Sequence, residues 1–121
     1  MRIVATCTTL PDRYDTLMKT LYCLKNQDIK LDKIYVTIPY KSTRLNKVYP
    51  PIPKEIKTLA TIVRVKTDYG PLCKLFGALH YEHDPNTIII SVDDDCTYPS
   101  NLVSSLIHHH QYDPDVAICG T

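Results

Sequence analysis

Three consecutive aspartates, Asp93, Asp94 and Asp95, follow an apolar run at residues 87–92 that is typical of a buried strand. Like charges held this close repel one another unless a cation neutralises them, so the run predicts a divalent metal site. Because side chains alternate along a strand, we expect Asp93 and Asp95 to hold Mg²⁺ or Mn²⁺ together while Asp94 points away. Such cations keep coordination positions for phosphate oxygens. The alternative is a solvated acidic turn that caps the helix after Pro99.

A second group of residues has the features of an anion-binding helix start. Asp68, Tyr69 and Gly70 precede a helix that the apolar spacing predicts over residues 72–82, and Lys74 lies within its first turn. Backbone N–H groups at a helix start favour anions, and Lys74 would add a positive charge beside the same phosphate. The alternative is an ordinary glycine-proline turn followed by a surface lysine.

A third group of polar side chains lies at the end of the first predicted strand. The hydroxyls of Thr6 and Thr8 and the guanidinium of Arg13 suit a base, a ribose or a phosphate. Alternatively, the threonines bond to local backbone, and Arg13 pairs with Asp12 or Asp15.

Short apolar runs alternate with helical periodicities along the chain. The runs predict strands at residues 2–6, 33–38, 60–66, 87–92 and 116–119. The periodicities predict helices at residues 14–26, 54–59, 72–82 and 101–110, with Asp12 or Asp15 capping the first. The third helix carries Leu72, Leu75, Phe76 and Leu79 on one face. Residues 40–59 form a polar, proline-rich connection, expected to be a functional loop or partly mobile.

This alternation predicts an α/β fold, with a Rossmann-like, mostly parallel sheet and helices on both faces. The 121 residues suit a single domain, residues 1–121. In such sheets ligands collect beyond the carboxyl ends of the strands, where all three groups of polar residues are expected to lie. An unpaired sheet edge near the fifth strand could recruit a second copy into a homo-oligomer.

Composition excludes several classes of protein. With 44% hydrophobic and 22% charged residues and a net charge of +1, the chain predicts an ordinary soluble domain without a nucleic-acid partner. Its apolar runs are too short for a membrane span and no signal peptide forms at the N-terminus, so we expect a cytoplasmic protein. The five cysteines are widely spaced, which favours reduced thiols.

The histidine run His108–His110 is not expected to bind one metal ion, since consecutive helical residues point in different directions. A zinc site that combines Cys96 and Cys119 with one of these histidines lacks the usual ligand spacing.

The strand at residues 88–92 with Asp93, Asp94 and Asp95 resembles the Asp-x-Asp strand of GT-A-type glycosyltransferases. Residues 3–13 resemble the first strand and nucleotide loop of that family, and residues 68–74 resemble the segment before its Asp-x-Asp strand. The resemblance implies a GT-A-like fold that binds a nucleotide-diphosphate sugar, in particular a UDP-sugar, with Mn²⁺ or Mg²⁺.

Carried over residue by residue, the resemblance implies that Asp95 binds the metal, Asp93 contacts ribose or metal, and Asp94 supports the ribose or the sugar. Thr8, Arg13, Asp68 and Lys74 would line the nucleotide. The acceptor, whether a glycan, a protein or a small molecule, is unknown, as is the catalytic base. Since the chain given ends at Thr121, soon after the acidic run, we expect donor binding more firmly than complete transfer.

Two other functions fit the acidic run. Asp93 to Thr97 also resembles the Asp-x-Asp-x-Thr motif of haloacid-dehalogenase-type phosphatases, whose first aspartate is a nucleophile and whose metal is Mg²⁺, although no lysine follows Asp95. A non-catalytic module that binds a nucleotide-sugar is the other alternative. A sugar-phosphate nucleotidyltransferase fits less well, because no glycine-rich loop follows the first strand.

Overall fold

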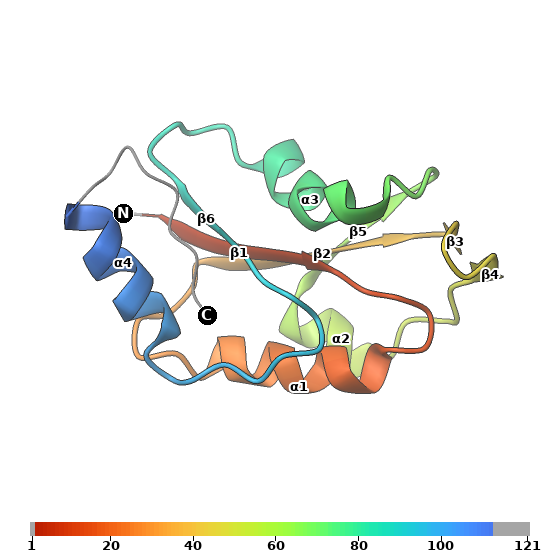
Figure 1. Ribbon diagram of the computed structural model, residues 1–121, viewed down its shortest axis with the longest axis horizontal. Helices are drawn as coiled ribbons and strands as arrows, with labels where there is room; N and C mark the ends of the chain where they lie inside the picture. The colour runs from red at the N-terminus through yellow and green to blue at the C-terminus, as the bar shows by residue number, and fades with distance from the viewer. Residues whose placement is uncertain (1, 113–121) are drawn as a thin grey trace.

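The computed structural model describes residues 2–112, which form a parallel sheet between two layers of helices (Figure 1). The strands are β1 (Ile3–Thr8), β2 (Lys33–Pro39), β3 (Lys41–Ser42), β4 (Lys47–Val48), β5 (Thr61–Val65) and β6 (Ile88–Ser91). The helices are α1 (Tyr14–Lys25), α2 (Lys54–Leu59), the 3-10 helix η1 (Gly70–Leu72), α3 (Cys73–Tyr81) and α4 (Leu102–Tyr112). The predicted α/β class is confirmed.

The main sheet has the strand order β5-β2-β1-β6, and all three pairings are parallel. β1 therefore lies between β2 and β6, with Val4 opposite both Lys33 and Ile89. Four of the predicted strands match these elements to within about two residues at their ends. The fifth predicted strand, residues 116–119, lies outside the described residues.

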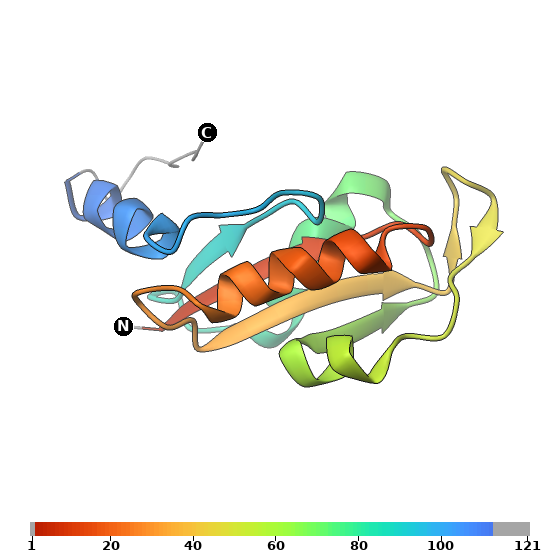
Figure 2. The ribbon, with the colours of Figure 1, turned by 90° about the horizontal axis from the view of Figure 1, so that it is seen from below.

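The larger core fills the face of the sheet that α1 and α2 cover (Figures 1 and 2). Leu17, Leu21 and Leu24 recur at helical spacing along α1 and are completely or almost completely buried against this face. Neither Asp12 nor Asp15 caps α1, so that prediction is wrong. Arg13 is the N-cap residue, without a side-chain capping bond, because Asp12 instead pairs with Lys47 at the start of β4.

On the opposite face, α3 packs through small side chains rather than through its large apolar ones. Its buried residues are Cys73, Gly77 and Ala78, whereas the predicted apolar face, Leu72, Leu75, Phe76 and Leu79, is exposed. A Cβ at Gly77 would lie 2.8 Å from the Thr37 hydroxyl, so only glycine permits this approach. The buried threonine hydroxyls of the sheet explain the orientation, because they bond to the helix backbone. Gly77 N–H donates to the Thr37 hydroxyl at 3.0 Å, and the Thr6 hydroxyl donates to the Lys74 carbonyl at 2.5 Å.

The long connection between β2 and β5 contains regular secondary structure. It contains the β3–β4 hairpin and α2, and α2 has the predicted bounds, Lys54–Leu59. The hydroxyl of Tyr49 donates to the Thr9 carbonyl at 2.6 Å, and that of Tyr14 donates to the Pro50 carbonyl at 2.9 Å. These bonds fasten the connection to the loop between β1 and α1 and to α1 itself. Within residues 2–112, no helix has the length and apolar character needed to span a membrane.

Candidate functional site

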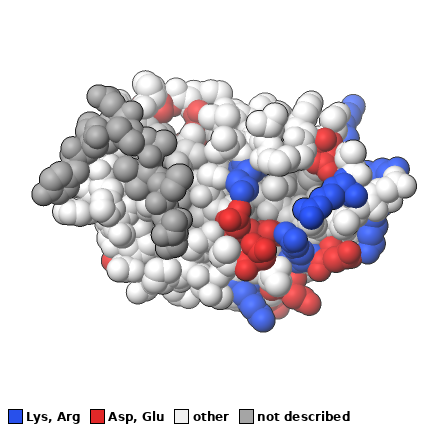
Figure 3. All heavy atoms as spheres, in the orientation of Figure 1, with Lys and Arg blue, Asp and Glu red and all other residues white. Residues whose placement is uncertain are grey.

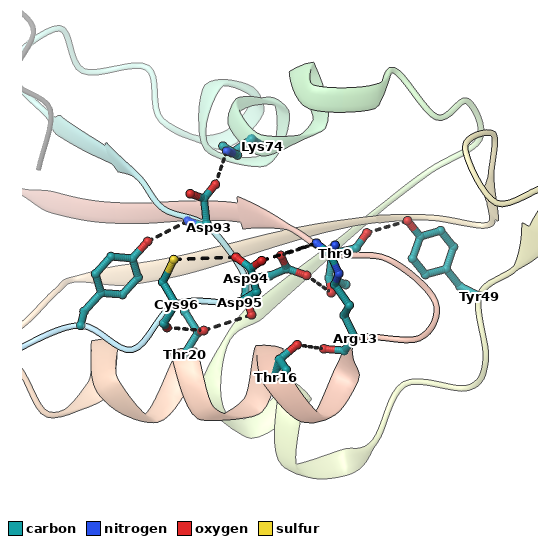
Figure 4. A network of polar contacts seen from close by, with 11 residues as sticks. Thr9, Arg13, Thr16, Thr20, Tyr49, Lys74, Asp93, Asp94, Asp95 and Cys96 are labelled. Atoms are coloured by element: carbon teal, nitrogen blue, oxygen red, sulfur yellow. Dashed lines mark hydrogen bonds and ion pairs between the residues drawn. The ribbon is translucent and has the colours of Figure 1, made fainter. Parts of the chain in front are cut away.

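The acidic run lies at the carboxyl edge of the sheet, directly beyond β6. The backbone N–H of Val92 donates to the Thr6 carbonyl at 3.0 Å, so the pairing with β1 continues up to the first aspartate. Parallel neighbours end at the same edge, and the loop that follows β1 therefore meets the acidic run (Figure 4).

Asp94 turns into the protein and joins these two segments. The residue is only 6% exposed, the Thr9 hydroxyl donates to its Oδ2 at 2.6 Å, and the Arg13 guanidinium lies 3.5 Å from its Oδ1. A carboxylate removed from water needs such partners, because an unpaired buried charge is costly. Asp94 is therefore placed to position the run rather than to meet a ligand.

Asp93 and Asp95 point away from the core, with side chains 56% and 51% exposed. One oxygen of each carboxylate and the sulfur of Cys96 lie within 4.8 Å of one another, and no other such group of three occurs within the described residues. A cation between these atoms could contact all three. Carboxylate oxygens suit Mg²⁺ and Mn²⁺, while the sulfur is a softer ligand.

Hydrogen bonds with the side chains of Thr20 and Tyr98 hold the backbone of the acidic turn. The Thr20 hydroxyl of α1 lies 3.0 Å from the Asp94 carbonyl and 2.7 Å from the Cys96 carbonyl (Figure 4). The backbone N–H of Asp93 donates to the Tyr98 hydroxyl at 2.9 Å. Burial is the main cause that raises the pKa of Tyr98 to about 12, so this phenol stays neutral at physiological pH.

Two cationic side chains flank the exposed carboxylates. Lys74 Nζ lies 2.5 Å from Asp93 Oδ1, and Arg13 Nη1 lies 4.0 Å from Asp95 Oδ2. On the face shown in Figure 3, acidic side chains gather in a cluster with Lys and Arg side chains beside it. Arg13 thus pairs with the acidic run and not with Asp12 or Asp15. This alternation of charge suits a metal ion and a phosphate group bound side by side.

The hydroxyls of Thr6 and Thr8 bond to backbone carbonyls, but these are distant in the chain and are not the local backbone that the alternative interpretation expected. Thr6 donates to the Lys74 carbonyl, and Thr8 donates to the Thr37 carbonyl at 2.7 Å. The bond from Thr6 also fixes the part of α3 that carries Lys74.

Asp68, Tyr69 and Gly70 build a turn beside the β3–β4 hairpin. Asp68 accepts backbone hydrogen bonds from Thr43 and Gly70, both at 2.8 Å. Gly70 has φ +64°, a left-handed conformation that favours glycine, and Tyr69 is exposed and stacks on Phe76 at 5.8 Å between ring centroids. From this segment, Lys74 is the residue whose side chain reaches the acidic run.

Sequence reasoning did not assign Cys96 to the Mg²⁺ or Mn²⁺ site, and it missed three residues that support the site: Thr9, Thr20 and Tyr98. Thr20 could have been recognised from the sequence, because it is a small polar residue among the leucines on the buried face of α1. No sequence pattern marks Thr9 or Tyr98 as a supporting residue, since their contacts depend on how separate segments pack against one another.

The remaining metal candidates do not converge within the described residues. The rings of His108 and His109 lie 5.8 Å apart at 67°, and no histidine belongs to a described group of potential ligands. Cys119, the other cysteine of the conceivable zinc site, lies outside the described residues.

No protein-family model matches this sequence, and no curated protein is significantly similar to it. Any functional assignment therefore depends on the geometry and chemistry of the acidic run and its neighbours.

Proposed function

We propose that this chain binds a nucleotide-diphosphate sugar through a divalent cation held by Asp93 and Asp95. On this proposal it is a metal-dependent glycosyltransferase, or the donor-binding part of one, and UDP-sugars are the first ligands to test. The observation that carries the proposal is the close approach of two exposed carboxylates and the Cys96 sulfur beyond a parallel strand.

The donor set fits Mn²⁺ or Mg²⁺. Both carboxylates are solvent-accessible, and two oxygens leave further coordination positions open for phosphate. When bound, the cation would neutralise the diphosphate and stabilise the leaving nucleotide during transfer.

The residues around the cation site have separate roles in this proposal. Lys74 and Arg13 are placed to neutralise phosphate oxygens beside it, as a point charge and as a planar donor respectively. Asp94 has no free oxygen directed at a ligand and instead fixes the turn through Thr9. The proposal therefore assigns ligand contact to the two exposed aspartates and positioning to the buried one.

The test compares two aspartate variants by titration calorimetry with UDP and MnCl₂. Asp95→Ala should lose more than about tenfold in Mn²⁺-dependent affinity for UDP, since a metal ligand contributes at least as much as the groups that support ligands. Asp15→Ala, an exposed aspartate in the first turn of α1, is the matched control and should bind like the wild type. Undiminished binding in the Asp95 variant would refute the proposal.

The ion pair between Lys74 and Asp93 favours a second candidate, a Mg²⁺-dependent phosphatase. An exposed aspartate beside a lysine is also a suitable nucleophile for phosphoryl transfer. Hydrolysis of a phosphomonoester with Mg²⁺, lost in Asp93→Asn, would support the phosphatase. Mn²⁺-dependent release of UDP from a UDP-sugar would support the glycosyltransferase, and binding without turnover would indicate a non-catalytic donor-binding module.

A further inference from the structure

The outer edge of β5 borders a groove that the proposed function does not use. Among the residues that the structure describes, β5 pairs only with β2, so its other edge has no partner strand. A cavity of about 300 Å³ lies along this edge, and residues 62–67 line one side of it. The other side is lined by aromatic residues of α3 and the turn before it: Tyr69, Phe76, His80 and Tyr81.

The aromatic side chains form a continuous row. Tyr69 stacks on Phe76 at 5.8 Å between centroids, Phe76 stacks on His80 at 6.1 Å, and His80 meets the edge of Tyr81 at 4.8 Å. Stacked rings hold one another in place, so a ligand in the groove would meet an apolar surface that is already ordered.

The two faces of β5 differ in the charge of the side chains that an added strand would meet. Val63 packs beneath α3 with Ala78, so the odd-numbered positions face the aromatic row. Ile62 packs against the core on the other face, and alternation places Arg64 on that face too, while Lys66 follows directly after the strand. The edge of β5 therefore presents apolar side chains toward α3 and positive charge on the opposite face of the sheet.

The guanidinium of Arg64 forms no ion pair with any described residue. Its guanidinium lies 4.4 Å from the Tyr40 ring centroid, Nη2 makes a long 3.5 Å contact with the Pro39 carbonyl, and the buried Nε has no hydrogen-bond partner. Lys66 is exposed and forms no ion pair with any described residue. The residues that line the groove include no carboxylate to balance these charges.

We propose that the β5 edge binds an extended segment of a partner protein, in which apolar and acidic residues alternate. The segment adds to the sheet as a strand and forms backbone hydrogen bonds with β5. Its apolar side chains enter the groove against Tyr69 and Phe76, and its acidic side chains face Arg64 and Lys66. A second copy of the chain fits less well, because it would bring two cationic edges together.

The test uses a short fluorescent peptide that alternates isoleucine and glutamate, with binding measured by fluorescence anisotropy. The peptide should bind with a Kd below about 1 mM and should slow hydrogen exchange of the β5 amides. Lys66→Glu should weaken binding about fivefold or more, while Lys19→Glu, an exposed lysine on α1, should leave it unchanged. Phe76→Ala should also weaken it, whereas Leu79→Ala, outside the groove, should not.

Two control peptides separate strand addition from other attraction. A peptide with lysine in place of glutamate, and one with alternate backbone nitrogens methylated, should both fail to bind. Equal binding of either control, or no binding of the glutamate peptide up to about 1 mM, would overturn the proposal. A dimer in sedimentation that Phe76→Ala dissociates would assign the groove to a second copy and would also overturn it.

Discussion

Replacing Lys74 by methionine should change metal and nucleotide binding in opposite directions. The ammonium of Lys74 lies 2.5 Å from Asp93, at the carboxylate that the proposed cation would use. This ammonium neutralises part of the charge of Asp93 and therefore competes with a metal ion for the carboxylate. With nucleotide present, however, the displaced lysine can bind the diphosphate, so its loss then removes a favourable contact.

The sizes of the two effects follow from exposure and charge. The side chains of Lys74 and Asp93 are 33% and 56% exposed, so their ion pair contributes about 0.2–1 kcal/mol. Lys74→Met should therefore tighten Mn²⁺ binding without nucleotide by up to about fivefold. A hydrogen bond to a charged group contributes about 1.5–3 kcal/mol, so UDP binding with Mn²⁺ should weaken about 10- to 100-fold.

Titration calorimetry with MnCl₂ alone, and then with UDP in saturating Mn²⁺, measures both constants on the same sample. Lys19→Met, an exposed lysine on α1, is the matched control and should change neither. The reasoning fails if Lys74→Met weakens Mn²⁺ binding in the absence of nucleotide, because Lys74 would then support the metal instead of competing with it.

Three further predictions concern stability. Asp94→Asn should lower the free energy of unfolding in urea by about 1.5–3 kcal/mol, since the Thr9 hydroxyl would then bond to a neutral amide in place of a carboxylate, and an unchanged midpoint would contradict this. Gly77→Ala should lower the free energy of unfolding by about 1–3 kcal/mol, because its Cβ would meet the Thr37 hydroxyl. A gain in thermal stability would contradict this and would show that the sheet can shift to accommodate the added methyl group. The Arg2 guanidinium is the main cause that lowers the pKa of Glu82 from 4.5 to about 2. The stability that ionised Glu82 contributes should therefore be complete above pH 4.5 and should decline as the pH falls toward 2, and Glu82→Gln should flatten acid unfolding across that range.

The sequence predicted the described strands of the main sheet well because each is a short apolar run bounded by polar or proline residues. It predicted the helix at residues 72–82 but not its orientation. Periodicity shows that one face is apolar, whereas the approach to the sheet is decided by Gly77 and by the Thr37 hydroxyl, which bonds to the helix backbone.

The candidate site was only partly predictable for a similar reason. Chain order and strand polarity place Asp93, Asp95 and Lys74 at one edge of the sheet, and the structure brings them together there. The contacts of Thr9 and Thr20 require β6 to lie next to β1. That adjacency is a property of strand order, which local residue patterns do not encode.

The bond between Thr9 and Asp94 joins residues 85 positions apart in the chain. Contacts between residues so far apart in the chain form slowly, because the entropy lost on closing the loop must be offset by other native interactions. During refolding, the proposed cation site should therefore be completed only when β6 docks on β1, after α1 has formed. A time course of Mn²⁺ binding would then report when β6 docks on β1. Mn²⁺ added to the refolding buffer would stabilise only those chains in which this docking had already occurred.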